Sequence, residues 1–303
     1  MGSTFQSWDV GNQISLNMGG ILLGMCGPPS VELRLDQDVA LFRAETARCD
    51  IQVAIHSAAS LDSCAGETIF DSGAVWKLFH EHNIRIFDFH SPVFGPRPYK
   101  RLRMDSDFRN GELILSSQLY EQENDCCPLE YPVDELLITN YLAHHALGIE
   151  VHGCGLIDAE TGGHLFLGHS GAGKSTTARI WETFRVPEIL SDDRIILRLH
   201  DDELWMHGTP WHGEAAFASP GKAKLDRIHI LRQGRQNTFS ALPPARAVGE
   251  VFARSFPPFH SEEGLEHTLD FIKQALEAVP CYEFEFLPDG SSVAAVLGFG
   301  NRD

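Results

Sequence analysis

The segment at residues 168–175 carries the clearest chemical pattern in the sequence. It reads GHSGAGKS and matches G-x-x-x-x-G-K-[ST] at every fixed position. An apolar stretch precedes it and an amphipathic stretch follows, so a strand should lead into the loop and a helix should leave it. Glycines let backbone N–H groups face phosphate oxygens, and the helix dipole favours the same anions. We therefore predict a nucleotide-binding phosphate loop; the alternative is a glycine-rich turn with an accidental lysine.

Individual residues of this loop would carry separate parts of ATP binding. The expected cofactor-binding residues are Gly168, His169, Ser170, Gly171, Ala172, Gly173, Lys174, Ser175 and Thr176. Lys174 should reach the β- and γ-phosphate oxygens, and the Ser175 hydroxyl should be a ligand of Mg²⁺. The predicted cofactors are therefore ATP and Mg²⁺.

An acidic pair follows the loop in the sequence. Asp192 and Asp193 follow the short apolar stretch 189–190 after one serine. In a parallel sheet such side chains project from the carboxyl end of a strand, where ligands bind. One carboxylate can hold Mg²⁺ while its neighbour accepts a proton from an attacking hydroxyl. Both are predicted catalytic residues and Asp192 is also a predicted metal ligand, although the sequence does not apportion the roles; a solvated acidic turn is the alternative.

His152 is a third candidate catalytic residue, because it lies on the predicted strand that leads toward the phosphate loop. Histidine is suited to proton transfer near neutral pH, although a single histidine on a strand is often structural. The segment 208–214 reads GTPWHGE and is expected either to contact substrate or nucleotide or to form a packed structural corner. Beyond it, Lys222 and Lys224 could approach phosphate or remain solvated charges.

Two regions with different patterns of apolar and polar residues should position these side chains. In the first part of the chain, alternating apolar and polar residues predict a mostly antiparallel β subdomain with one solvated face. Strands are expected there at 31–35, 51–55, 76–79, 84–89, 100–104 and 112–115. From residue 149 onward, strands alternate with helices, which indicates α/β organisation. Strands are expected there at 149–157, 164–167, 189–190, 194–199, 204–206, 227–231 and 282–286, and the chain's helices at 133–147, 175–184, 245–256 and 262–279.

The predicted fold class is therefore α+β or α/β, in two domains. Residues 1–130 would form a β-rich accessory or substrate-recognition subdomain. Residues 131–303 would form a phosphate-loop kinase domain with a mixed sheet.

Composition limits the class of partner. Hydrophobic residues make up 43% and charged residues 22% of the 303 residues, as in ordinary globular proteins. Acidic residues outnumber basic ones 42 to 24, and a net charge of -18 argues against nucleic acid as a partner. Seven cysteines without a C-x-x-C pair fit reduced thiols in the cytoplasm. The apolar run 19–26 is short and lacks a basic flank, so neither a signal peptide nor a membrane helix is expected. Met18 could be the true start, which would leave residues 1–17 as a loose extension. The sequence leaves open whether the chain forms a homo-oligomer.

Taken in order, three motifs resemble a known family. His152-Gly153, the loop 168–175 and Ser191-Asp192-Asp193 are similar in order and approximate spacing to the catalytic domain of HPr kinase/phosphorylase, over roughly residues 149–235. The resemblance implies a nucleotide-binding core related to that of phosphoenolpyruvate carboxykinase, with ATP and Mg²⁺ as cofactors and a serine hydroxyl as acceptor. It also implies that His152 assists the base and that the two aspartates supply base and metal ligand.

The sequence departs from the family pattern in three places. Thr176 stands where the family has an acidic residue, which bears on metal or phosphate handling. Residues 205–208 replace a Glu-x-Arg-Gly signature, which leaves the reverse, phosphorolytic reaction open, and residues 1–148 do not resemble the bacterial regulatory domain. We predict an ATP-dependent kinase whose acceptor is a hydroxyl of a peptide, a protein or a small molecule. The alternative is a nucleotide-binding regulatory or scaffold protein without kinase turnover.

Overall fold

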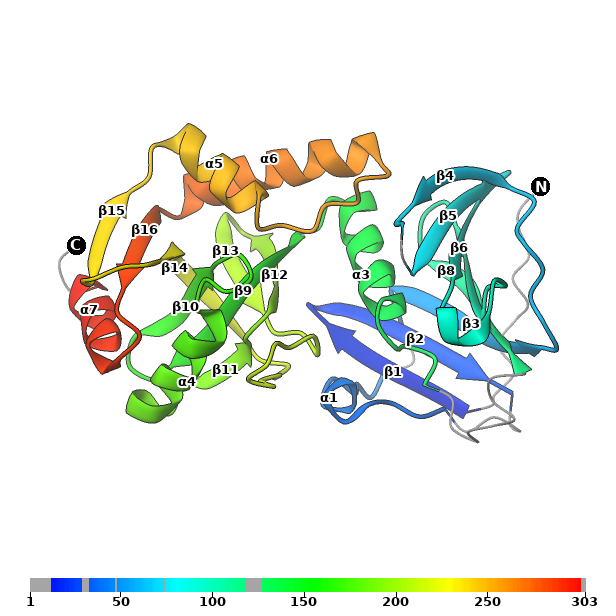
Figure 1. Ribbon diagram of the computed structural model, residues 1–303, viewed down its shortest axis with the longest axis horizontal. Coiled ribbons are helices and arrows are strands. Elements are labelled where there is room, and N and C mark those ends of the chain that lie inside the picture. The colour runs from blue at the N-terminus through cyan, green and yellow to red at the C-terminus, as the bar shows by residue number, and fades with distance from the viewer. Residues whose placement is uncertain (1–11, 29–32, 47, 74, 118–126, 301–303) are drawn as a thin grey trace. The chain divides into compact units, whose positions relative to one another are not determined.

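The structure is a computed structural model that describes residues 12–28, 33–46, 48–73, 75–117 and 127–300 (Figure 1). The chain divides into two compact units, one of Met1–Asn17 with Ile21–His145 and one of Met18–Gly20 with Ala146–Asp303. The boundary predicted at residues 130/131 lies before the one between His145 and Ala146 in the structure, because helix α3 (Val133–His144) belongs to the first unit. Part of the strand predicted at 31–35 lies outside the described residues.

The first unit is built on one eight-stranded sheet with the order β1-β2-β3-β8-β7-β6-β5-β4. The strands are β1 (Asn12–Met18), β2 (Ile21–Gly27), β3 (Ile51–Ala58), β4 (Glu67–Asp71), β5 (Trp76–Glu81), β6 (Ile84–Phe89), β7 (Lys100–Asp105) and β8 (Asn110–Ser116). The strands from β8 to β4 pair antiparallel, whereas β3 is parallel to both of its neighbours. A short helix α1 (Gln37–Ala40) and a 3₁₀ turn η1 (Pro92–Phe94) complete the unit.

Sequence alternation located the strands whose two faces differ. Buried and half-buried residues alternate along β7, as its sequence predicts, and His82 takes a φ of 55° in the tight turn before β6. Strand β2 coincides with the apolar run 19–26 and is mostly buried along its length, so it shows no alternation. Residues 12–17 belong to β1 and are not part of a loose extension.

The second unit contains a five-stranded barrel. Strands β9 (Ile149–Asp158), β10 (Gly162–Leu167), β12 (Arg194–His200), β13 (Glu203–His207) and β14 (Lys222–Gln233) follow the order β10-β9-β12-β13-β14, and β14 returns to pair with β10. β16 (Cys281–Phe286) and β15 (Thr238–Ala241) extend the sheet from β14, and β11 (Glu188–Ser191) pairs with β9. The helices are α4 (Lys174–Arg185), α5 (Pro244–Phe252), α6 (Glu262–Ala278) and α7 (Gly290–Gly300).

The predicted fold class is wrong. The structure is mostly β, with 40% strand and 25% helix, and its two eight-stranded sheets do not form an α/β phosphate-loop kinase fold. Most elements of the second unit lie where the sequence places them, but their connections differ. β12 and β13 form an antiparallel hairpin without an intervening helix, and β10 pairs with both β9 and β14, which closes the sheet.

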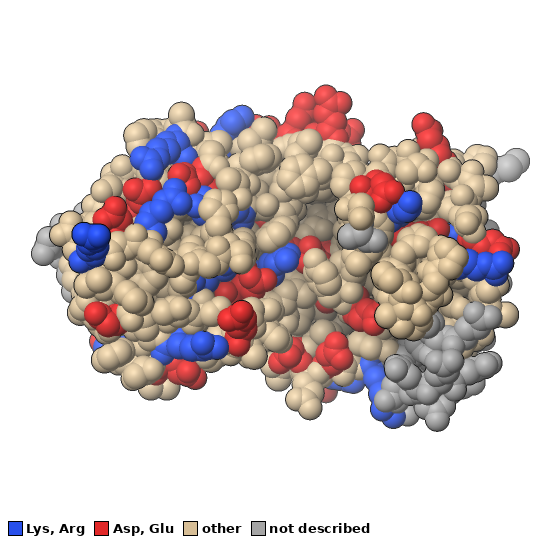
Figure 2. Space-filling view, in the orientation of Figure 1, with Lys and Arg blue, Asp and Glu red and all other residues tan. Residues whose placement is uncertain are grey.

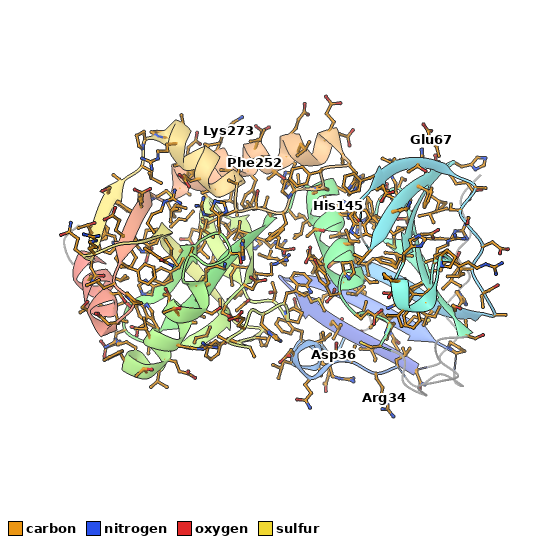
Figure 3. All side chains as sticks on the ribbon, in the orientation of Figure 1. Arg34, Asp36, Glu67, His145, Phe252 and Lys273 are labelled. Carbon is orange, nitrogen blue, oxygen red and sulfur yellow. The ribbon has the colours of Figure 1, made fainter. Side chains whose placement is uncertain are left out.

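Two clusters of buried side chains hold the second unit together. Alternate residues of each strand point to opposite faces, so Val151 and Leu165 enter the cluster that α5 and α6 cover, whereas Leu156 and Phe166 meet Trp181 of α4. Phe252 packs at the end of α5, while Lys273 of α6 pairs with Asp270 at 2.8 Å on an exposed helix face (Figure 3). Because Trp181 belongs to the second cluster, the core fixes helix α4, which begins directly after the loop 168–173.

Charges of both signs share the visible surface. Lys and Arg side chains are interspersed with Asp and Glu on the face shown in Figure 2, and the described residues form no continuous basic area there. Within the described parts of the chain, no helix combines the length and apolar character needed to cross a membrane.

Two buried histidines should make the stability of the second unit depend on pH. Burial lowers the pKa of His164 to about 4 and that of His229 to about 3. Below about pH 6.5 the unfolded chain binds protons at these imidazoles that the folded chain does not bind. The free energy of unfolding should therefore fall as the pH falls from about 6.5 to the folded pKa of each imidazole, about 4 for His164 and about 3 for His229, with a slope of up to about 1.4 kcal/mol per pH unit for each.

The substitution His229→Phe should remove one of these slopes. The ring of His229 lies among Phe166, Phe239 and Phe284, and neither of its nitrogens has a hydrogen-bond partner among the described residues. Phenylalanine keeps a flat ring and removes two buried polar atoms, each of which costs about 1–3 kcal/mol when unsatisfied. Urea unfolding at about pH 7 and about pH 5 measures the effect. The same pH dependence in both proteins would contradict it.

Candidate nucleotide-binding site

The phosphate loop joins β10 to α4, as its sequence predicts. β10 ends at Leu167 and α4 begins at Lys174, so the loop residues 168–173 lie between them. Gly171 has a φ of 78° and Gly173 a φ of 110°, a backbone region that residues with a Cβ rarely adopt. A Cβ at position 173 would also lie 2.6 Å from the ring of Phe286. Both local conformation and packing therefore require glycine there.

Lys174 is buried at the start of α4, under the loop. Its Nζ donates to the carbonyl oxygens of Gly168 at 3.1 Å and His169 at 3.4 Å. Burial lowers the pKa of Lys174, and the nearby Asp193 and Asp192 partly oppose this effect. The ammonium group thus lies against backbone carbonyls of the loop, where phosphate oxygens could replace these acceptors.

The remaining loop residues differ in exposure. His169, Ser170 and Thr176 are exposed, and Ala172 is half-buried. A side chain that the sequence did not single out fixes the tip of the loop, since Gln233 at the end of β14 donates from Nε2 to the carbonyl of Gly171 at 2.9 Å. The backbone of the loop is therefore held from β14 as well as from α4.

An ion pair between a half-buried arginine and a buried aspartate holds the far end of α4. Arg185 donates through Nε and Nη2 to the two carboxylate oxygens of Asp158, at 2.8 and 2.9 Å. These hydrogen bonds lower the pKa of Asp158, which is buried at the end of β9. The pair fixes α4 to the β9–β10 hairpin that carries the loop.

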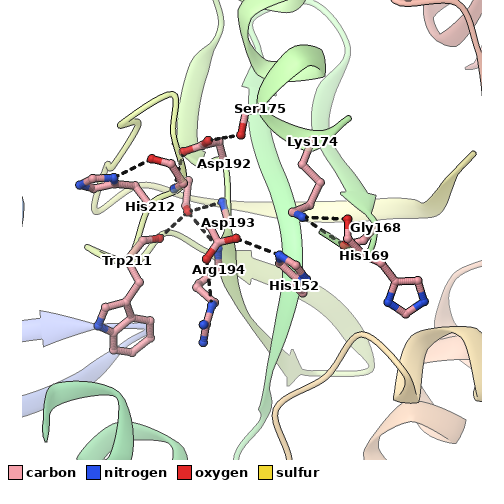
Figure 4. A network of polar contacts seen from close by, with 12 residues as sticks. His152, Gly168, His169, Lys174, Ser175, Asp192, Asp193, Arg194, Trp211 and His212 are labelled. Atoms are coloured by element: carbon pink, nitrogen blue, oxygen red, sulfur yellow. Dashed lines mark hydrogen bonds and ion pairs between the residues drawn. The ribbon is translucent and has the colours of Figure 1, made fainter. Parts of the chain in front are cut away.

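Asp192 is fully buried beside the start of α4. Ser175 donates from Oγ to its Oδ2 at 2.6 Å (Figure 4). Backbone amides of the following loop also point at this carboxylate: Gly213 at 2.9 Å, Ala215 at 3.1 Å and Phe217 at 3.4 Å. The predicted metal ligands Ser175 and Asp192 are thus in direct contact.

Asp193 is more open and has different partners. Its Oδ1 lies 2.9 Å from Nε2 of His152, and its Oδ2 accepts from Nε of Arg194 at 3.0 Å (Figure 4). Burial raises the pKa of Asp193, but the hydrogen bond from His152 and the charge of Arg194 outweigh it and lower this pKa to about 2. Because the carboxylate is ionised, Nε2 of His152 must be the donor.

Ser191 shapes the acidic turn, although sequence spacing gave it no role. Its Oγ accepts from the backbone N–H groups of Asp193 and Arg194, both at 3.0 Å, and donates to the carbonyl of Trp211 at 2.7 Å. One hydroxyl thereby links the strand end at β11 to the loop that covers Asp192. Serine hydroxyls commonly bond nearby backbone groups in this way. The serine directly before the two aspartates was therefore the feature of the sequence that could have indicated this role.

The segment 208–214 divides into two parts. Thr209 and Trp211 are buried, which fits a packed corner, and Gly213 binds Asp192 through its backbone. His212 and Glu214 are exposed. The segment therefore contributes a backbone amide to the site, whereas the side chains of His212 and Glu214 face solvent.

Lys222 and Lys224 do not join the site. β10 and β14 run parallel with Leu167 beside Ile230, so the start of β14 lies at the end of the sheet away from the loop. Lys224 pairs with Glu203 at 2.8 Å, and Lys222 lies 5.4 Å from the centre of the Trp205 ring.

The site brings together a glycine-rich loop with a buried lysine, a hydroxyl–carboxylate pair, and a more open carboxylate with an imidazole. In the described residues, no three His, Cys, Asp or Glu side chains gather as a group that could hold a metal ion. A Mg²⁺ ion bound together with nucleotide needs fewer protein ligands, because phosphate oxygens and water supply the others. Protein-family models and curated protein sequences give no match to this chain.

Proposed function

We propose that this protein is an ATP- and Mg²⁺-dependent kinase that transfers the γ-phosphoryl group to a hydroxyl. The observation that carries the proposal is the 2.6 Å hydrogen bond between Ser175, at the start of α4 after the phosphate loop, and Asp192, directly after β11. A serine or threonine of the loop and a strand-end aspartate are the two side chains with which phosphate-loop enzymes hold Mg²⁺. The glycine conformations and the buried Lys174 fit the same ligand.

In this proposal the residues of the loop bind the nucleotide. Backbone N–H groups of residues 168–173 and the ammonium of Lys174 hold phosphate oxygens, and Ser175 and Asp192 hold the metal. Bound Mg²⁺ would neutralise charge on the phosphates. Asp192 is already surrounded by donors from the loop after Trp211, which favours the metal-side role for it over that of an open base.

Asp193 is the proposed general base. Its side chain is 27% exposed, whereas that of Asp192 is fully buried. The acceptor hydroxyl gives its proton to the Asp193 carboxylate, and its oxygen forms a bond to the γ-phosphorus. The bond from that phosphorus to the β–γ bridging oxygen breaks, and ADP leaves with the electron pair. His152 orients the Asp193 carboxylate through the hydrogen bond to Oδ1.

The acceptor class follows from the motif order rather than from any bound group. The similarity to HPr kinase/phosphorylase favours a serine hydroxyl on a peptide, a protein or a small molecule. The cysteine pattern favours action in the cytoplasm. This proposal concerns the chemistry of the site and does not depend on a kinase fold.

Incubation with ATP labelled at the γ-phosphate tests the proposal. Peptides, proteins and free serine are offered as acceptors, with and without EDTA, and mass spectrometry detects a phosphate adduct. We expect ADP to form in proportion to phosphorylated acceptor, and only with a divalent cation. ATP binding without acceptor-dependent turnover would instead indicate a regulatory or scaffold protein. The absence of ATP binding would contradict the assignment of a nucleotide-binding site.

A further inference from the structure

A short segment after α5 runs beside the strand that carries His152. The backbone N–H of His152 donates to the carbonyl of Arg254 at 2.7 Å, and that of Phe256 donates to the carbonyl of Glu150 at 3.0 Å. Ser255 forms an antiparallel bridge with Val151 between these two bonds. The segment therefore has a fixed register against β9, which places the ring of Phe256 at a defined position.

Phe256 lies against both groups that bind Asp193. Its ring centre is 3.8 Å from the guanidinium carbon of Arg194 and 5.9 Å from the centre of the His152 ring. Arg194 donates through Nη1 to Glu150 at 2.8 Å, and the side chain of Glu150 is fully buried. The guanidinium is thus held by a buried carboxylate on one edge and by an aromatic face.

This arrangement fixes the plane of the Asp193 carboxylate. One oxygen is bound by His152 and the other by Arg194, at 2.9 and 3.0 Å. A guanidinium is planar, presents its donors in a rigid fork and stacks on aromatic rings, whereas a lysine ammonium has none of these properties. An ordinary surface ion pair would not need the stacking partner or the buried carboxylate.

We propose that Arg194 is a positioning residue that orients Asp193 for proton transfer, and that Phe256 and Glu150 hold Arg194 in place. The proposal rests on the proposed function, since it assigns the orientation of the base in that reaction. Rate depends steeply on such geometry, because a displacement of about 1 Å can reduce it about 100-fold. The side chain of Arg194 donates to Asp193 and to Glu150, so its effect should fall on turnover.

The test compares conservative and non-conservative variants in the full-length protein. Arg194→Lys keeps the charge but loses the fork and the stacking, Phe256→Leu removes the ring, and Phe256→Tyr keeps it. Arg101→Lys is the matched control, because Arg101 also bonds an aspartate, the buried Asp88, at 2.7 Å, but in the first unit. Circular dichroism and thermal unfolding show whether each variant is folded.

We expect Arg194→Lys and Phe256→Leu to lower kcat by about 10- to 100-fold with little change in KM for ATP. Phe256→Tyr and Arg101→Lys should keep the wild-type kcat. Unchanged kcat in folded Arg194→Lys and Phe256→Leu would overturn the proposal, as would equal losses in Phe256→Tyr and Phe256→Leu.

A second readout separates this inference from the proposed function. The imidazole NMR signal of His152, identified by its loss in His152→Asn, reports the contact with Asp193 without any turnover. It should shift in Arg194→Lys, which leaves the ring of Phe256 in place, and should stay in place in Phe256→Tyr. If wild-type protein phosphorylates no acceptor, the proposed function fails, and an unmoved His152 signal in Arg194→Lys would then also overturn the positioning role.

Discussion

Asparagine in place of Asp193 should lower kcat for phosphoryl transfer by about 10²- to 10⁴-fold, the usual contribution of a general base. Asparagine keeps the size of the side chain but removes the charge that accepts a proton. The affinity for ATP should change little, since the Asp193 carboxylate bonds His152 and Arg194. Steady-state kinetics with a phosphorylated acceptor as the product measures both quantities.

Asp192→Asn is the matched comparison for this experiment, because the two residues are neighbours with different partners. In the wild-type protein the carboxylate of Asp192 accepts hydrogen bonds from Ser175 and from backbone amides of the loop that covers it. We expect this variant to weaken Mg²⁺-ATP binding as well as turnover. His152→Ala should cause a smaller loss than Asp193→Asn, because the imidazole supports the base without accepting the proton. Near-normal phosphorylation by Asp193→Asn would mean that the base lies elsewhere.

Replacement of Lys174 by alanine should reduce ATP affinity at least about 10- to 100-fold and abolish measurable turnover. A hydrogen bond from a charged donor contributes about 1.5–3 kcal/mol, and Lys174 is the cation that the loop itself supplies. The fold should survive, because Gln233 still holds the loop through the carbonyl of Gly171 and Trp181 still anchors α4 in the core. Isothermal titration calorimetry with ATP and Mg²⁺ measures the affinity.

Lys224→Ala provides the control for the loss of a lysine. Lys224 is exposed, pairs with Glu203 and lies toward the end of β14 away from the loop. ATP affinity should therefore remain at the wild-type value. Equal affinity in Lys174→Ala and the wild type would contradict the phosphate-loop assignment.

The sequence located individual elements better than their connections. Local signals sufficed for β7, whose residues alternate, and for α4, whose apolar face recurs with helical spacing and follows a glycine loop. Strand β2 gave no such signal, because its residues are mostly buried and a continuous apolar run does not identify a strand. The fold class failed for a different reason: β10 pairs with β14, whose residues lie far along the chain, and no local pattern predicts that closure.

The acidic pair shows where sequence reasoning about the site stops. Asp192 and Asp193 are adjacent and chemically identical, so residue type and spacing could not separate their roles. Their surroundings differ because one side chain enters the interior, where amides of residues 213–217 converge on it, and the other meets His152 and Arg194. Those amides come from 21 to 25 residues further along the chain. Backbone donors of this kind leave no trace in side-chain identity, and the same holds for the carbonyl that Gln233 binds.

Closure of the sheet has a mechanical consequence for the phosphate loop. β10 has hydrogen-bonded neighbours on both sides, β9 and β14, so the strand that delivers the chain to the loop has no free edge. Sliding β10 by one residue would break two ladders at once and turn every side chain to the opposite face. Leu167 is therefore fixed along the strand, and the loop adjusts to a bound phosphate by backbone rotations within residues 168–173.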